Sequence, residues 1–102
     1  MNYSLINKQL VSDLEDEILQ KAISIFIKST QQDIEHFSIY IKKKQFPEIA
    51  NICHKIAGAS VSVGFEKFSE LAKIIEQNNG IQFQNEYQKL FDAFEQIKAV
   101  HS

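Results

Sequence analysis

His54 is the residue of this sequence whose surroundings best suit chemistry. On a helix surface, positions three and four residues away are neighbours. Around His54 those positions hold only small or short side chains: Ala50, Asn51, Ala57 and Gly58. The imidazole would therefore stand in a clearing that another protein could reach. A neutral imidazole is a good nucleophile at about pH 7, so this pattern is suited to nucleophilic chemistry.

Gly58 is an unusual residue for the middle of a helix, where glycine costs about 1 kcal/mol relative to alanine. One interpretation is steric, because it leaves no side chain one turn after the histidine. The other is structural: glycine lets a neighbouring helix pack closely, or marks a kink. Spacing alone leaves both interpretations open.

A metal site is not predicted. Cys53 and His54 are adjacent, so on a helix their side chains diverge by about 100°. His36 and His101 have no ligand spacing to them, and structural zinc normally needs four converging ligands. Cys53 lies on an apolar stripe and is predicted to be a small buried core residue.

Other catalytic and binding classes lack their motifs. There is no G-x-S-x-G sequence for a hydrolase and no glycine-rich loop for nucleotide phosphates. A kinase or ATPase activity of the chain itself is therefore not expected. The net charge is −2 and the 11 basic residues are all lysines, which argues against a nucleic-acid binder. The run at 42–44 is typical of solvated charge at a helix end.

The elements that would position His54 are helices. Only Pro47, Gly58, Gly64 and Gly80 could interrupt them. Apolar residues that recur every three or four positions predict long amphipathic helices over about residues 16–44, 46–63, 65–77 and 82–100. The predicted inward positions are Leu19, Ile23, Phe26, Ile34, Phe37 and Ile41, then Phe46, Ile49, Cys53, Ile56, Ser60 and Val63, then Phe65, Phe68, Ala72 and Ile75, then Phe83, Tyr87, Leu90, Phe94 and Ile97.

Short connections between these helices predict an all-α fold, an antiparallel up-down four-helix bundle. Before the first long helix, apolar residues between Leu5 and Leu14 suggest a short N-terminal lid helix packed across one end. The whole chain, 1–102, is expected to form one domain.

The stretch CHKIAGASVSVG, from Cys53 to Gly64, resembles the signature of histidine-containing phosphotransfer (HPt) domains. In that family a histidine is followed by any residue, an apolar residue, usually lysine, and glycine. A glycine or similar break follows, and then an amphipathic helix that often ends in an apolar–acidic pair. The matching residues are His54, Lys55, Ile56, Ala57 and Gly58, then Gly64, then Ile75 and Glu76. The resemblance covers essentially the whole chain.

The sequence departs from the family pattern at Ala57, where the family usually has lysine. That lysine would lie one turn after the histidine and could neutralise phosphoryl oxygens. Lys55 is adjacent to His54 in sequence, but it points about 100° round the helix and would have to curl back. The lysines at 42–44 could contribute at longer range.

The resemblance implies that His54 carries a phosphoryl group in a multistep two-component phosphorelay. The group would come from a receiver-domain aspartate and pass to another receiver, on a response regulator or a hybrid sensor histidine kinase. No cofactor is expected on this chain, because the divalent cation belongs to the receiver. Family members often use Glu or Gln on the next helix to hold the distal ring nitrogen. Glu76 has the matching place, with Gln77 as the alternative, although a solvated Glu76 is equally open.

The expected docking surface surrounds His54. Ala50, Asn51, Ala57 and Val61 lie on its side of the helix, and Gly58 and Lys55 support the site. Leu10 and Leu14 could reach over from the lid, or could cap the core instead. The rival interpretation is a non-catalytic helical adaptor that docks the same partners without phosphotransfer.

The composition argues against disulfide-rich, membrane and secreted proteins. Hydrophobic residues make up 44% and charged residues 24%, as in ordinary globular domains. One cysteine excludes an internal disulfide and fits a reducing compartment. No apolar run approaches the roughly 20 residues of a membrane span, and no signal peptide is evident. We therefore expect a cytoplasmic protein with no membrane or nucleic-acid partner, and a monomer, as is usual for the family.

Overall fold

The computed structural model describes residues 8–80 and 84–101, with side chains over 15–80 and 85–101. This part of the chain has no strands and forms four helices: α2 (Lys8–Lys42), α3 (Phe46–Ser62), α4 (Glu66–Gln77) and α5 (Gln84–His101). None of these helices combines the length and the apolar character needed to cross a bilayer. The prediction of an all-α four-helix bundle is confirmed.

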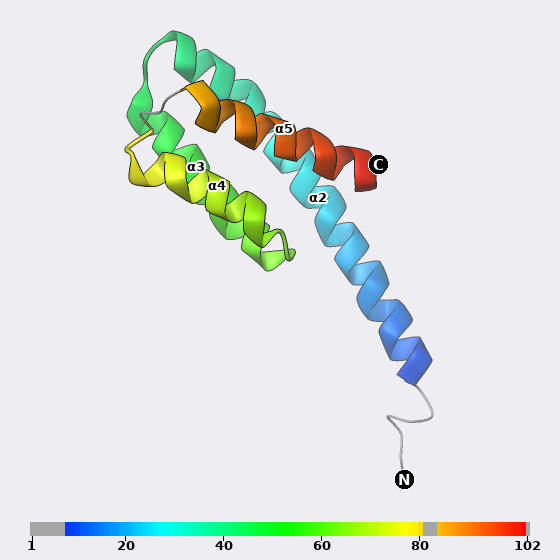
Figure 1. Cartoon of the computed structure of the whole chain (residues 1–102). Coiled ribbons are helices and arrows are strands. Elements are labelled where there is room, and N and C mark those ends of the chain that lie inside the picture. The colour runs from blue at the N-terminus through cyan, green and yellow to red at the C-terminus, as the bar shows by residue number, and fades with distance from the viewer. Residues whose placement is uncertain (1–7, 81–83, 102) are drawn as a thin grey trace.

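Successive helices reverse direction, in the up-down-up-down order expected from the sequence (Figure 1). Each helix contacts the next along the chain, and α2 also contacts α5, which closes the bundle. The connections 43–45 and 63–65 are short. Short connections leave consecutive helices side by side and antiparallel, so residues of α3 face residues of α4 that lie far along the sequence.

Pro47 and Gly80 shape the two ends of this helix pair. Pro47 lies in the first turn of α3, where its missing N–H leaves no helical hydrogen bond unmade. Gly80 follows α4 with a φ of +78°, and a Cβ there would collide with the carbonyl oxygen of Phe46. The Tyr87 hydroxyl donates a 2.6 Å hydrogen bond to the Gly80 carbonyl. The turn after α4 is therefore held against both α3 and α5.

The core lies where the four helices face one another. Its largest fully buried apolar side chains come from all four helices: Phe37, Ile49, Ile56, Ile75, Leu90 and Phe94. Phe37 of α2 meets the rings of Tyr87 and Phe91 of α5 edge-on, with centroids 5.1 and 5.4 Å apart. Such edge contacts add to the stabilisation from buried area, so they join the first helix to the last.

Leu19 differs from its prediction as an inward residue, because it is 42% exposed. With 35 residues, α2 is about 52 Å long, whereas α3 has 17 residues and is about 25 Å long. The N-terminal part of α2 consequently continues past the other helices (Figure 1). Leu19 lies one turn beyond Ile23, which is still buried. The stripe of apolar residues on α2 therefore extends further along the helix than the core of the bundle does.

The N-terminal lid is not seen as a separate helix. The described helix runs without a break from Lys8 to Lys42, whereas the sequence suggested a boundary near residue 16. The side chains of Leu10 and Leu14 lie outside the described residues, as does residue 83 of the predicted inward set. The packing of the N-terminal segment as a lid therefore stays a prediction.

Cys53 is a fully buried, free thiol on the inner face of α3, as predicted. Its pKa is raised from the ordinary 9.0 to about 12. Burial is the main cause, since it removes the thiolate from water, and the Glu76 carboxylate adds repulsion. The thiol thus stays protonated in the fold at pH values where an unfolded chain would lose the proton.

This difference makes a prediction about alkaline stability. The stabilisation from the protonated Cys53 thiol is complete below about pH 9 and is lost as the pH rises towards 12. We expect the free energy of unfolding, measured by urea denaturation and circular dichroism, to fall between about pH 8 and about pH 10.5. The fall should be shallower in Cys53→Ala than in the wild type, and equal slopes would contradict the prediction.

Candidate functional site

His54 projects from the middle of α3 into solvent. Its side chain is 80% exposed, although Cys53 before it and Ile56 after it are buried in the core. These two neighbours hold this part of the helix against the bundle. The imidazole is therefore carried by a well-packed segment and is open to a partner.

Glu76, near the end of α4, holds one side of the His54 ring. The Nδ1 atom lies 3.0 and 2.9 Å from the two carboxylate oxygens. A carboxylate only accepts hydrogen bonds, so in the neutral ring the proton sits on Nδ1 and the lone pair of Nε2 is free. Glu76 is therefore not merely a solvated helix-end charge. From the family resemblance we expected the distal ring nitrogen to be held, whereas Glu76 contacts Nδ1, the ring nitrogen nearer the main chain.

A second contact sets the register of α3 against α4. The buried Ser69 hydroxyl donates a 2.9 Å hydrogen bond to the carbonyl oxygen of Ala57. Because the two helices are antiparallel, moving from Glu76 back towards Ser69 on α4 corresponds to moving from His54 forward to Ala57 on α3. The two contacts therefore fix which residues of α4 lie beside the histidine.

A hollow of about 590 Å³ lies beside the His54 ring, between α3 and α4. It is lined by His54, Ala57, Gly58 and Val61 from α3, and by Lys73, Glu76 and Gln77 from α4. Within each helix these residues are three or four positions apart, so each set forms one stripe of helix surface. A partner that reaches the free Nε2 would rest in or beside this hollow.

Gly58 is exposed, and a Cβ added to it would meet nothing within 4 Å. Close packing of a neighbouring helix therefore does not explain the glycine, which sits inside the unbroken helix α3. Of the two interpretations left open by the sequence, the steric one is favoured: glycine keeps the surface one turn from His54 free of any side chain.

Lys55 was expected to support the site, but the structure turns it away from His54. Its Nζ atom lies 3.1 Å from the Asp33 carboxylate of α2, and Asp33 is buried. A buried carboxylate gains strongly from a cationic partner, which is the physical reason that Lys55 points towards α2. Its ammonium group is therefore already paired and does not line the His54 hollow.

The predicted docking residues divide by exposure. Asn51 is exposed, Val61 is 51% exposed, and Ala50 is half-buried. Ala57 is only 4% exposed, so it forms the floor of the hollow and offers little surface of its own. Leu10 and Leu14 are outside the described side chains, so their part in docking remains a prediction.

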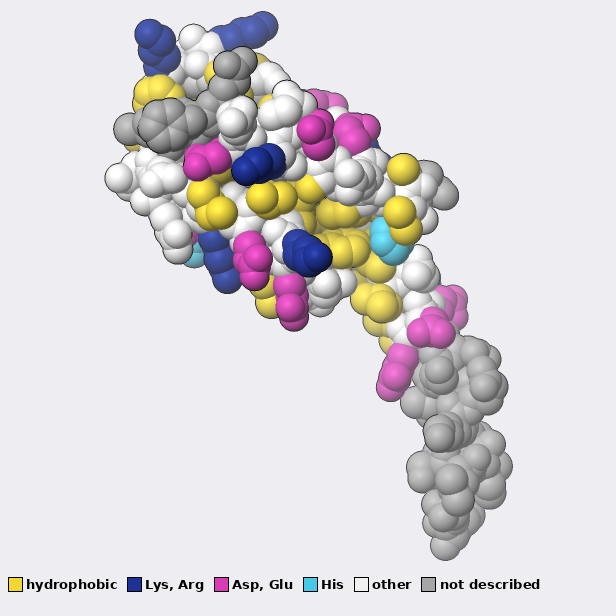
Figure 2. All heavy atoms as spheres, viewed as in Figure 1, with side chains coloured by type: hydrophobic (Ala, Val, Ile, Leu, Met, Phe, Trp, Pro, Cys, Tyr) yellow, Lys and Arg dark blue, Asp and Glu magenta, His cyan; other side chains and the backbone are white. Residues whose placement is uncertain are grey.

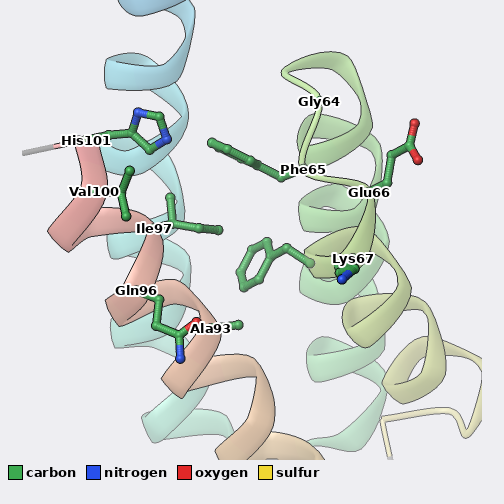
Figure 3. Close-up of a pocket in the computed structure, with 10 residues that line it drawn as sticks. Gly64, Phe65, Glu66, Lys67, Ala93, Gln96, Ile97, Val100 and His101 are labelled. Carbon is green, nitrogen blue, oxygen red and sulfur yellow. The ribbon is translucent and has the colours of Figure 1, made fainter.

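A separate groove of about 530 Å³ lies between the start of α4 and the end of α5. In Figure 3 the rings of Phe65 and His101 face each other across it, and Ile97 and Val100 line the α5 side. Hydrophobic side chains gather along this seam in Figure 2. His54 and Glu76 do not line the groove, so it is not part of the histidine site.

Lys73 also lines the His54 hollow, although it was not predicted from the sequence. It lies three residues before Glu76 and so shares its helix face, a signal that the sequence does contain.

Across the described side chains, no three His, Cys, Asp or Glu residues gather in a way that could hold a metal ion. The site is therefore built from an imidazole, a carboxylate and an ammonium group.

The Glu76 contact predicts the tautomer of His54. In the neutral ring, ¹⁵N NMR should show the proton mainly on Nδ1. Glu76→Gln should keep this tautomer because the amide oxygen also accepts a hydrogen bond, whereas Glu76→Leu should move the proton to Nε2. The exposed His36 is the internal control and should not respond. A wild-type ring protonated on Nε2 would contradict the assignment.

Comparisons with known proteins agree with this geometry. The family described as "Hpt domain" matches residues 21–100, which include all four helices in whole or in large part. Searches of the curated proteins and of the solved structures give no match. The match extends over most of the chain and contains His54, Gly58 and Glu76. The chain therefore belongs to the Hpt domain family, whose members are phosphocarriers with a histidine phosphotransfer role in two-component signalling.

Proposed function

We propose that this protein accepts a phosphoryl group on His54 from the aspartyl phosphate of a receiver domain and passes it to another receiver. The observation that carries the proposal is the held imidazole. Glu76 binds Nδ1, while the rest of the side chain is exposed beside a hollow that a partner can enter.

The geometry suits a nucleophilic role for Nε2. Its lone pair would attack phosphorus and form a P–N bond, while the P–O bond to the aspartate breaks and the carboxylate leaves with the electron pair. The proton on Nδ1 stays in place, so the phosphorylated ring is cationic. The Glu76 carboxylate, 2.9 Å from Nδ1, faces that charge and stabilises it. The return step reverses these bonds, so no other proton donor or acceptor is required.

The remaining requirements fall to the partner. Phosphoryl transfer depends on positioning and on neutralising charge, and in this proposal the receiver domain brings the aspartate and a divalent cation. The partner is the receiver of a response regulator or of a hybrid sensor kinase, which would dock over Asn51, Gly58 and Val61. The cytoplasmic location and the monomeric state expected from the sequence belong to this proposal.

The first test is phosphoryl acceptance. Incubation with a ³²P-labelled receiver domain should label the wild type, and the label should be acid-labile and alkali-stable, as expected of phosphohistidine. His54→Ala should remain unlabelled, because the nucleophile is gone, while its circular dichroism stays helical. His36→Ala is the matched control and should be labelled like the wild type.

Absence of label on the wild type across several receivers, with the helical fold intact, would contradict the proposal. It would favour the adaptor interpretation, in which the same surface docks partners without chemistry. Label that persists in His54→Ala would also contradict it, because another residue would then be the acceptor.

A second prediction separates the stability of the fold from docking at Gly58. Gly58→Ala should raise the free energy of unfolding by about 1 kcal/mol, because alanine is the better helix former and nothing lies within 4 Å of the new Cβ. Transfer from the receiver should nevertheless slow several-fold, because the methyl group enters the surface the partner covers.

The matched variant is Ala59→Gly, which changes the next, exposed residue of α3 outside the hollow. It should lower the free energy of unfolding by about 1 kcal/mol and leave transfer unchanged. Transfer by Gly58→Ala at the wild-type rate would show that the partner does not approach this part of α3.

A further inference from the structure

Because residue 57 is alanine, the lysine that could neutralise the phosphoryl oxygens from one turn after His54 is missing. A phosphoryl group on His54 brings anionic oxygens to a surface where the nearest charged partner, Glu76, is itself an anion. Anionic oxygens held near a carboxylate repel it, and an ammonium group within reach offsets that repulsion. The three lysines on α3 and α4 are the natural candidates for such a cation: Lys55, Lys67 and Lys73.

Two of these lysines lie away from the His54 hollow. Lys55 pairs with the buried Asp33 of α2 at 3.1 Å. Lys67 lines the groove between α4 and α5 and not the His54 hollow. Lys73 alone among the three lines the hollow together with His54. It is exposed and, among the described residues, it makes no ion pair.

The helix register places Lys73 beside the stretch of α3 between His54 and Ala57, the position of the missing lysine. Ser69 of α4 is bonded to the carbonyl of Ala57, and Glu76 is bonded to His54. Lys73 lies between Ser69 and Glu76 on α4, so its level on α3 lies between His54 and Ala57. Helical side chains also tilt towards the N-terminus of their helix, which for α4 is the direction of Ala57 and Gly58.

We propose that Lys73 supplies, from α4, the cation that binds the phosphoryl oxygens on phosphorylated His54. This inference rests on the proposed function of His54 and adds a residue to it. The small side chains at 57 and 58 leave the space between Lys73 and the ring open. The lysine ammonium and the Glu76 carboxylate therefore flank the imidazole in complementary roles: one binds the phosphoryl group, and the other binds Nδ1.

The test uses phosphoramidate, a small phosphoryl donor that needs no docking surface. Nε2 attacks the phosphorus of the N-protonated reagent, the P–N bond of the reagent breaks, and the nitrogen leaves as ammonia with the electron pair of that bond. The rate of phosphohistidine formation and the hydrolysis rate of the product can both be followed by ³¹P NMR. Any effect of Lys73 on partner docking is absent from this measurement.

We expect Lys73→Gln to slow phosphohistidine formation about three- to tenfold, as for the loss of one charge-assisted contact at a solvated site. Lys73→Arg should stay within about twofold of the wild type, because the positive charge is kept. Lys67→Gln, on the same helix but outside the hollow, is the matched control and should not change the rate. Added salt should slow the wild type more than Lys73→Gln, since screening acts on the charge that the variant lacks.

The outcomes separate this inference from the proposed function. A wild type labelled on His54 with Lys73→Gln equally fast would overturn the role of Lys73 and leave the phosphocarrier proposal standing. Slowing in both Lys73→Gln and Lys73→Arg would also overturn it, because charge would not be the property that matters. A wild type that is never labelled on His54 would overturn the proposed function and this inference together.

Discussion

The register between α3 and α4 is the constraint on which the site depends. One buried hydrogen bond, from the Ser69 hydroxyl to the Ala57 carbonyl, ties the two helices at one level. Fully buried residues of both helices fill the interface between α3 and α4, among them Cys53, Ile56 and Ile75. Sliding α4 by one turn would unpair that hydroxyl inside the core, where an unmade hydrogen bond is costly. The exposed contact between His54 and Glu76 is thus held in place by buried interactions that take no part in the chemistry.

The sequence predicted the helices well because their pattern is local. Apolar spacing, Pro47 at the start of α3 and Gly64 after it are enough to place α3, α4 and α5, and the inward residues from Ile23 onward are largely buried as expected. They do not place the start of α2, which begins at Lys8 where the sequence suggested a boundary near residue 16. Leu19 could not be placed correctly in this way. Its periodicity is the same as that of Ile23, and only the length of α2 relative to the other helices decides that one is exposed and the other is buried.

The site was partly predictable for a similar reason. His54 and Gly58 stand out within one helix, and the family resemblance placed Glu76 opposite them. The direction of Lys55 depends on Asp33, a buried carboxylate on another helix, and no pattern along α3 contains that information. To predict the position of Lys73, one must know the register between α3 and α4 as well as the helix itself. Its place relative to Ala57 is defined only by the contacts of Ser69 and Glu76 with α3.

The openness of the site also bears on how a carrier of this kind works. An imidazole that is 80% exposed cannot exclude water by itself, so in the proposed function a phosphoryl group on His54 has to survive in contact with solvent. Among the described side chains, the Glu76 carboxylate that contacts the ring is already bound to Nδ1, so it is not placed to activate that water as a general base. In this proposal, fast transfer requires what the receiver domain would contribute on docking: exclusion of water, a metal ion and an aligned aspartate. A chemically simple site on a well-packed helix pair is therefore consistent with the proposed function, in which the phosphoryl group stays on His54 until a receiver docks and is then transferred.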